Sequence, residues 1–354
     1  MKKALFIGGS LLLAAFFVGP TGCYLARGAW EEGRILARRQ PITKLVADPR
    51  TDTLVRRKLA LVLSARNYAR DSIGLATEES FTTYSKLDKD TLVLVLSVAY
   101  RDKLEPYTWW FPIVGRVPYK GFFDFETARR EAKSFDARGF DVVLRPSPAF
   151  STLGWFNDPL TSVALARDTL ELVSTVMHEV THNTFYAPGQ AAFNESFASF
   201  VGARGAAAFF RSRGQPQAAL RVDAEWEDDK LLGDFWTALS RTLDSAYAAH
   251  PDSREARIRV RDTVYMRARR SLVSDIGPRL ATVGPLYVQR VQLNNAALLA
   301  RRVYAKDLDL FDRIYTREGR NLKRSIARII ALARSDKKDP YGAVRRWLGL
   351  PPEK

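Results

Sequence analysis

Two of the three histidines of the chain lie four residues apart, in the stretch HEVTH from His178 to His182. On a helix, residues four apart lie on one face about one turn from each other, so both imidazoles can bind one metal ion. Glu179 lies between them on the neighbouring flank, where a carboxylate can hold a water molecule and accept its proton. This H-E-x-x-H spacing is typical of zinc metallopeptidases. The alternative is a buried helix that carries two histidines by chance, and the uncharged residues 172–177 do predict burial.

A catalytic zinc site needs a third protein ligand and one position left open for water. Glu195 follows His182 by thirteen residues and is the best-placed carboxylate. The proline and the glycine within 186–190 predict the end of the first helix, and Asn194 is a plausible N-cap of a second one. Two antiparallel helices joined by this turn can bring Glu195 close to both histidines. The alternative is an ordinary first-turn glutamate, which the helix dipole favours.

Residues 1–22 have the composition of a signal peptide, with two lysines followed by the apolar stretch 4–18. That stretch is too short for a comfortable transmembrane span. Cys23, the only cysteine, follows where a bacterial lipoprotein carries its lipid, although Pro20 stands where such sequences usually have leucine. We expect lipidation at Cys23, membrane tethering and a periplasm-facing location in the cell envelope. A simple cleaved signal peptide and an uncleaved short anchor are the alternatives. A single cysteine excludes an intrachain disulfide.

The order of the predicted elements indicates an α+β fold. We expect a membrane-proximal lead-in at 23–50 and one domain at 51–350, rich in strands over 80–157 and helical over 158–348. Strands that precede helices predict an N-terminal, mostly antiparallel sheet followed by a helical region that contains the HEVTH helix. The expected helices are 52–71, 125–138, 192–213, 216–247, 251–274, 284–304, 306–317, 319–335 and 339–348.

The segment 149–156 precedes the metal helix and is predicted as a strand at the edge of the sheet. A peptide substrate can pair with such an edge as an extra strand. Thr152, Leu153 and Gly154 are therefore candidate substrate-binding residues, and the glycine allows close approach of a backbone. A plain buried strand is the alternative. Asp158 and the proline after it predict the cap and first turn of the long helix that carries HEVTH.

Six blocks of the chain together resemble a known family. In order they are FPIVG (111–115), YKGFFD (119–124), STLGWFNDPL (151–160), HEVTH (178–182), FNESFA (193–198) and LNNA (293–296). This order is similar to that of a bacterial family described as putative aminopeptidases, whose members look like lipoproteins, and the likeness covers nearly the whole chain after residue 23. The resemblance implies a zinc-dependent peptidase of the gluzincin type. It implies that His178, His182 and Glu195 hold the metal and that Glu179 is the catalytic base.

Peptide hydrolysis also needs a donor to the oxyanion besides the metal. His250, Tyr287 and Tyr304 are candidates, and a surface histidine and core tyrosines are the alternatives. An aminopeptidase further needs an anion for the free amine of its substrate. Asp124 and Asp158 lie in the family-like blocks, although Asp158 is equally well explained as a helix cap. The residues do not distinguish an exopeptidase from an endopeptidase, and they do not indicate the oligomeric state.

The formal net charge is +16, and +14 without Lys2 and Lys3. Such a charge can hold a tethered protein beside anionic lipid, steer anionic polymers or substrates, or form a solvated basic surface. We expect no nucleic-acid partner, because a signal peptide and the lack of a nucleic-acid motif argue against one. The partner we expect is a peptide substrate. A catalytically idle, zinc-stabilised envelope scaffold or chaperone is the alternative function, although Glu179 argues against it, since a structural site fills its fourth position.

Overall fold

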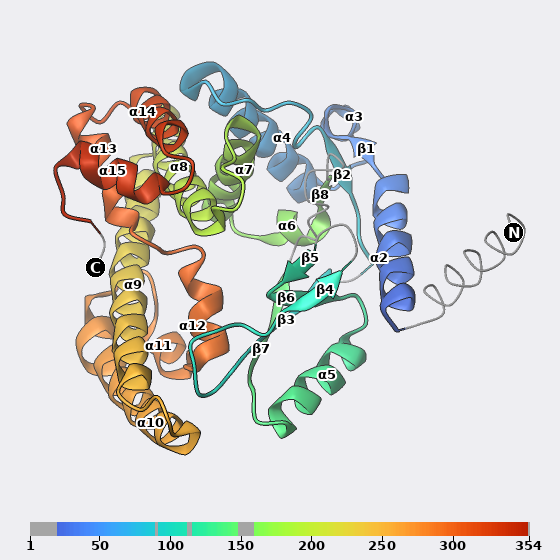
Figure 1. Ribbon diagram of the computed structural model, residues 1–354. Helices are drawn as coiled ribbons and strands as arrows, with labels where there is room; N and C mark the ends of the chain where they lie inside the picture. Colours follow the sequence, from blue (N-terminus) through green and yellow to red (C-terminus); the bar gives the residue numbers. More distant parts are fainter. Residues whose placement is uncertain (1–19, 89–90, 112–114, 148–158, 353–354) are drawn as a thin grey trace, which may run out of the picture.

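The computed structural model describes residues 20–88, 91–111, 115–147 and 159–352. This part of the chain is mostly helical and contains three small sheets, which is an α+β arrangement in coarse outline (Figure 1). Its helices are α2 (Pro20–Ala37), α3 (Ile42–Ala47), α4 (Thr53–Tyr68), α5 (Phe125–Ala137), α6 (Ser162–Ala166), α7 (Thr169–Thr184), α8 (Ala191–Ser212), α9 (Pro216–Ala248), α10 (Arg254–Ser271), α11 (Pro285–Arg290), α12 (Asn295–Arg302), α13 (Leu308–Arg317), α14 (Leu322–Ser335) and α15 (Pro340–Leu348). Among the described residues, no helix is long and apolar enough to cross a membrane.

The strands are short and form separate sheets, where the sequence predicts one larger sheet. They are β1 (Gln40–Pro41), β2 (Thr83–Ser85), β3 (Val93–Ala99), β4 (Trp109–Phe111), β5 (Gly115–Val117), β6 (Tyr119–Phe122), β7 (Asp141–Ser147) and β8 (Leu160–Thr161). The sheets have the orders β1-β2-β8, β6-β3-β7 and β4-β5. All pairs are antiparallel except β2 with β8, which run parallel.

The sheet β6-β3-β7 has one covered face and one face turned towards the rest of the molecule. Its covered face carries Leu96, Phe122 and Leu144, which pack against Phe135 of α5. Because neighbouring side chains of a strand point to opposite faces, the residues between these belong to the other face. In the register of the sheet, Tyr119 lies opposite Ser97 and Arg145 lies opposite Val95. Tyr119 and Arg145 therefore share the face that points away from α5.

The N-terminal helix α2 packs onto the strands. The ring of Tyr24 lies 5.5 Å from that of Phe111 and 6.0 Å from that of Phe122. Ile35, near the other end of α2, is buried together with Val93 and Phe123. The predicted lead-in segment is thus in contact with the strand-rich part of the chain.

The start of the HEVTH helix differs from the prediction. Asp158 lies outside the described residues, and the chain after Pro159 forms β8 and the short helix α6 before α7 begins at Thr169. The N-cap of α7 is Asp168, whose carboxylate accepts hydrogen bonds from the backbone N–H groups of residues 170 and 171. The aspartate-proline pair does not open this helix, because Leu160 and Thr161, which follow it, pair with β2. Their pairing is a long-range contact that local sequence does not reveal.

The helical part is built on two cores. Aromatic side chains of α8 and α13 lie at the centre of the larger core, where Phe193, Phe197, Phe200 and Phe311 are at most 1% exposed. Burying one such side chain contributes about 1.5–3 kcal/mol to stability. The smaller core joins α9 to α10, α11 and α12 through side chains such as Trp236 and Leu243. The predicted helix 284–304 is two helices, because Asn294 ends the extended segment after α11 and caps α12.

A buried polar network joins α12 to the sheet. Asn295 is fully buried, and its side-chain amide donates to the carbonyl oxygens of Tyr100 and Lys103 at 2.7 and 3.0 Å. The backbone N–H of Asn295 donates to the Asp141 carboxylate at 2.8 Å, at the start of β7. Arg261 of α10 donates to the same carboxylate. These contacts fix the segment that follows α12 relative to β7.

Candidate metal centre

The three residues predicted as metal ligands lie together. His178 and His182 of α7 and Glu195 of α8 each offer one ligand atom, and these atoms all lie within 4.8 Å of one another. The two Nε2 atoms are 3.3 Å apart. Glu195 Oε2 lies 3.3 Å from His178 Nε2, and Glu195 Oε1 lies 3.7 Å from His182 Nε2. This group of donors is a possible metal site.

The spacing of these atoms fits a tetrahedral ion. Ligand atoms held at about 2.0–2.1 Å from a tetrahedral centre are about 3.3–3.4 Å from one another. The Nε2–Nε2 and the shorter Nε2–Oε distance match that edge length. Among the described residues, two imidazoles and one carboxylate are the available ligands, which leaves a fourth position; the three side chains are 19–25% exposed, so solvent can reach the site. Glu179 is exposed beside them.

Close packing of α7 against α8 brings the donors together. One side of α7 is buried through Leu172, Val176 and Val180, which recur every four residues. Gly202 of α8 permits the close approach, because a Cβ atom there would lie 3.0 Å from the backbone oxygen of Ser174 and 3.4 Å from His178 Cβ. The histidines therefore face the first turns of α8, where Glu195 stands.

Asn194 is not the N-cap that the sequence predicts. Helix α8 begins at Ala191 with Gln190 as its N-cap. The buried Asn194 side chain instead accepts a hydrogen bond from Ala187 N at 2.9 Å and donates one to Ala187 O at 2.8 Å. It thereby fixes the turn between α7 and α8, immediately beside Glu195.

The ionisation states of two donors suit metal binding. Burial and the neighbouring His178 lower the pKa of His182, so its imidazole is neutral near pH 7. Burial acts to raise the pKa of Glu195, but its hydrogen bond with His178 and the charges of both histidines outweigh burial and lower the pKa overall. Neutral imidazole and ionised carboxylate are the forms that bind metal ions.

Two tyrosines and one arginine lie on the side of the site formed by the sheet and the segment after α12. Tyr304 is 42% exposed; its partial burial raises its pKa, the charge of Glu195 raises it further, and Arg145 acts in the opposite direction through its charge and a side-chain hydrogen bond. Burial and the charge of Glu195 also raise the pKa of Tyr119, and Arg145 again opposes them. Both phenols therefore keep their protons at neutral pH. Among the three candidates for the oxyanion donor, Tyr304 is the one whose pKa is raised by the charge of Glu195.

The segment that carries Tyr304 is held from three sides. The backbone N–H of Lys306 donates to the hydroxyl of Ser196 at 3.2 Å, one residue after Glu195. On α9, a Cβ atom at Gly233 would lie 2.7 Å from the backbone oxygen of Ala305. The hydroxyl of Tyr341 donates to Lys306 O at 3.1 Å. The sequence does not predict this arrangement, and its one local sign is Gly233, the single glycine inside α9.

Other sequence candidates lie elsewhere. His250 is exposed in the turn between α9 and α10, at the end of α9 opposite to α8 in Figure 1. Tyr287 is 54% exposed on α11. Asp124 caps α5, accepting from Thr127 N at 2.8 Å, on the covered side of the sheet. Thr152, Leu153 and Gly154, with the whole predicted edge strand and Asp158, lie outside the described residues.

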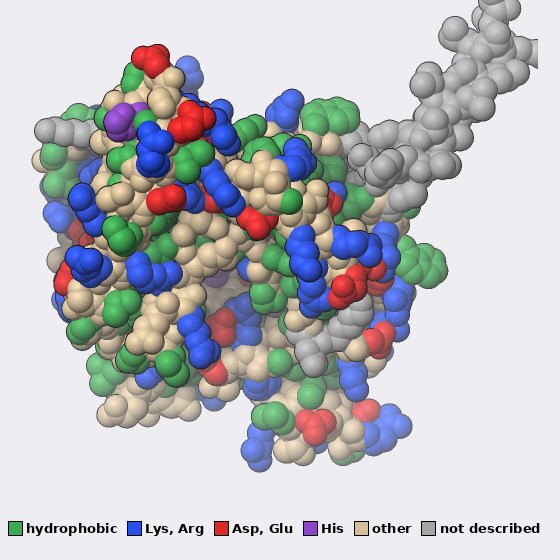
Figure 2. All heavy atoms as spheres, turned by 90° about the horizontal axis from the view of Figure 1, so that it is seen from below, with side chains coloured by type: hydrophobic (Ala, Val, Ile, Leu, Met, Phe, Trp, Pro, Cys, Tyr) green, Lys and Arg blue, Asp and Glu red, His purple; other side chains and the backbone are tan. Residues whose placement is uncertain are grey.

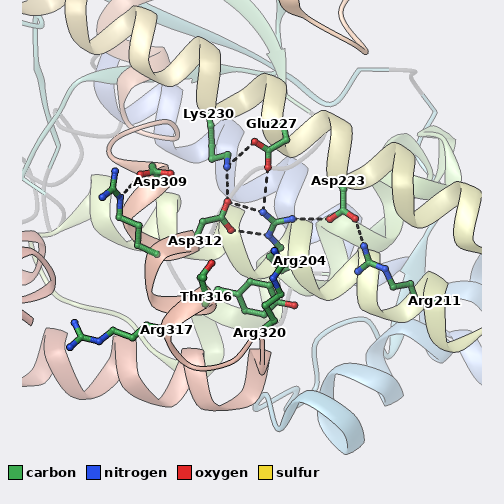
Figure 3. A pocket seen from close by; sticks show the side chains of 12 residues that line it. Arg204, Arg211, Asp223, Glu227, Lys230, Asp309, Asp312, Thr316, Arg317 and Arg320 are labelled. Atoms are coloured by element: carbon green, nitrogen blue, oxygen red, sulfur yellow. Dashed lines mark hydrogen bonds and ion pairs between the residues drawn. The ribbon is translucent and has the colours of Figure 1, made fainter. Parts of the chain in front are cut away.

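A hollow is visible in the middle of the face seen in Figure 2, with basic and acidic side chains inside it. A charged pocket of about 850 Å³ lies between α8, α9 and α13. Arg204, at its centre, follows Glu195 by nine residues and so projects from the opposite side of α8. In this pocket, Arg204 pairs with Asp312 and Asp223 at 2.7 and 2.8 Å (Figure 3). Six basic and four acidic side chains line this pocket, and none of the three metal-ligand candidates is among its lining residues.

Comparison with known proteins identifies the class. Residues 23–341 match the model of a family described as "putative aminopeptidase". This match covers most of the chain, and the chain belongs to this family. The resemblance predicted from the six sequence blocks is therefore confirmed at the level of the family. No curated protein and no solved structure gives a significant match to the chain.

Proposed function

We propose that the protein is a zinc-dependent metallopeptidase, with His178, His182 and Glu195 as metal ligands. One observation carries the proposal: three donor groups of the types that zinc prefers lie together, two of their three closest distances match the edge of a tetrahedron, and no described residue supplies a fourth ligand. A structural zinc site would have a fourth protein ligand. The family description supports peptide hydrolysis as the activity.

Glu179 is the general base of the proposed reaction. A bound zinc ion lowers the pKa of water and polarises the scissile carbonyl. The carboxylate of Glu179 accepts a proton from the attacking water and then passes it to the leaving amine. Its charge acts on His182, and its side chain is exposed on the same helix, so it can reach a substrate at the open position.

Tyr304 is the proposed donor to the oxyanion. Its phenol is protonated at neutral pH and lies near Glu195, on a segment that Ser196 and Gly233 hold in place. A positioned hydroxyl can donate a hydrogen bond to the oxygen that becomes negative in the transition state, and loss of one such donor costs about 10²–10³ in kcat. Tyr119 is the second phenol on this side of the site.

The proposal is tested with the purified protein. We expect about one equivalent of zinc by elemental analysis, cleavage of a peptide library, and loss of cleavage with a chelator that zinc restores. Glu179→Gln should keep the zinc and lose turnover by orders of magnitude. Glu171→Gln, on an exposed first-turn glutamate of the same helix, is the matched control and should behave like the wild type. Zinc binding without cleavage of any peptide would contradict the peptidase and favour the scaffold.

We further propose that the enzyme removes N-terminal residues and acts in the bacterial cell envelope, tethered through Cys23. The family description supports the first part, and the signal-like composition of residues 1–22 supports the second. Cleavage of peptides with free but not acetylated N-termini checks the specificity. Labelled palmitate should enter the wild type and not Cys23→Ser, and equal labelling of the two would contradict lipidation.

A further inference from the structure

Arg145 brings a positive charge to the side of the site formed by the sheet. It lies on β7, shares the sheet face of Tyr119, and is exposed. Less exposed arginines are paired with acids, as the buried Arg261 is with Asp141 and the half-buried Arg204 is with Asp312. Within the described residues, no carboxylate forms an ion pair with Arg145. Its charge therefore lies on the sheet face of Tyr119 without an acidic partner among the described residues.

The contact with Tyr304 places this guanidinium beside the proposed reaction centre. Helix α12 packs against β7 and β3, with Asn294 at its start donating to Val142 O at 3.1 Å, and Tyr304 follows the other end of this helix. Arg145 opposes the rise in the pKa of Tyr304 through its charge and a side-chain hydrogen bond, and it opposes that of Tyr119 through its charge. An arginine donates in this pair, which leaves the Tyr304 O–H free for another acceptor. A guanidinium has five N–H donors in a planar fork, so most of them stay available for a carboxylate.

We propose that Arg145 binds a carboxylate of the peptide substrate, close to the scissile bond. This rests on the proposed peptidase function and names its substrate class: peptides with either a terminal carboxylate or an acidic side chain within a residue or two of the bond that is cleaved. The Arg145 side chain lies close to Tyr304, whose segment is held one residue from Glu195 by the hydrogen bond from Lys306 N to Ser196 Oγ. A carboxylate bound there holds the substrate carbonyl on the side of the Tyr304 hydroxyl.

Matched peptide pairs test this assignment in the full-length protein. One pair differs by a free or amidated C-terminus, and the other by glutamate or glutamine next to the cleaved bond. The wild type should prefer the carboxylate member of at least one pair by about tenfold to a hundredfold in kcat/KM, the size of a hydrogen bond to a charged group. The first pair reports a terminal carboxylate and the second an acidic side chain.

Arg145→Gln should bring the preferred ratio close to one, while Arg145→Lys should keep part of it because the charge remains without the fork. Arg129→Gln, on an exposed arginine of α5, is the control and should keep the wild-type ratio. An unchanged ratio in Arg145→Gln would overturn the proposal. An equal loss for both members of each pair would also overturn it, because Arg145 would then act only by positioning Tyr304.

A binding measurement separates this inference from the proposed function. The dissociation constants of the same peptide pairs are measured with Glu179→Gln, alone and combined with Arg145→Gln. A preference for the carboxylate member that disappears in the double variant supports recognition by Arg145, even if the wild type cleaves no peptide. Equal affinities for both members in Glu179→Gln contradict recognition, even if the wild type cleaves peptides.

Discussion

Substitution of Gly202 by alanine should weaken metal binding without unfolding the protein. The new Cβ atom would lie 3.0 Å from the backbone oxygen of Ser174 and 3.4 Å from His178 Cβ. A contact of 3.0 Å with backbone must be relieved by moving α7 away from α8 by a few tenths of an ångström. That movement separates His178 from Glu195, whose ligand atoms stand 3.3 Å apart.

The stability cost of this change should be small. Overpacking costs about 1–3 kcal/mol, and replacing glycine by alanine inside a helix returns about 1 kcal/mol. The net loss in the free energy of unfolding is then about 0–2 kcal/mol. Displaced or poorly oriented ligands typically lower metal affinity by about 10–100-fold. We therefore expect a large effect on zinc affinity and a modest one on folding.

The assay is competition for zinc against a chromophoric chelator, with urea unfolding of the metal-free protein as the stability measurement. Gly205→Ala is the matched control one turn further along α8. Its Cβ would meet the side chain of Met177 at 3.2 Å, and a flexible methionine can move aside. Wild-type zinc affinity in Gly202→Ala would refute the reasoning, as would a larger loss of affinity in Gly205→Ala.

Three further substitutions test other parts of the account. Gly233→Ala should lower kcat at least tenfold at unchanged zinc content, because its Cβ would lie 2.7 Å from the oxygen of Ala305 and displace Tyr304; a normal kcat would contradict the role of that tyrosine. Asn295→Leu should lower the free energy of unfolding by about 3 kcal/mol in urea titrations, since it leaves several buried groups without partners; a loss below 1 kcal/mol would be inconsistent with the network. Burial acts to raise the pKa of Asp312, but hydrogen bonding and charge from Arg204 lower it overall. The ionised Asp312 therefore stabilises the folded protein at pH values above its unfolded-state pKa of about 3.9. This stabilisation is lost as the pH falls through the pKa of Asp312 in the folded protein. Urea unfolding below about pH 4 should show this loss in the wild type and not in Asp312→Asn, and equal slopes would contradict it.

The metal donors could be predicted because their relation is largely local. The four-residue spacing of His178 and His182 is set by the helix itself, and the turn at 185–190 leaves few ways to place α8. The close approach of the two helices depends on Gly202, which the sequence alone does not single out. The grouping of the three metal donors was therefore predictable, whereas the distance of 3.3 Å between the two Nε2 atoms was not.

The rest of the site could not be predicted because it depends on contacts between distant segments. Arg145 and Tyr304 are 159 positions apart, and the packing of α12 against the sheet, which Asn295 helps to fix, brings their segments together. Strand pairing was the weakest part of the fold prediction for the same reason. Leu160 and Thr161 pair with β2 about 76 positions earlier, which local sequence does not reveal.

X-ray absorption at the zinc edge of the zinc-loaded protein tests most directly whether one ion is held by His178, His182 and Glu195. The account predicts about four nitrogen and oxygen ligands at about 2.0 Å, with the outer-shell scattering of two imidazoles. His182→Ala should remove one imidazole from that pattern. Absence of imidazole scattering, or a spectrum unchanged by His182→Ala, would contradict the account.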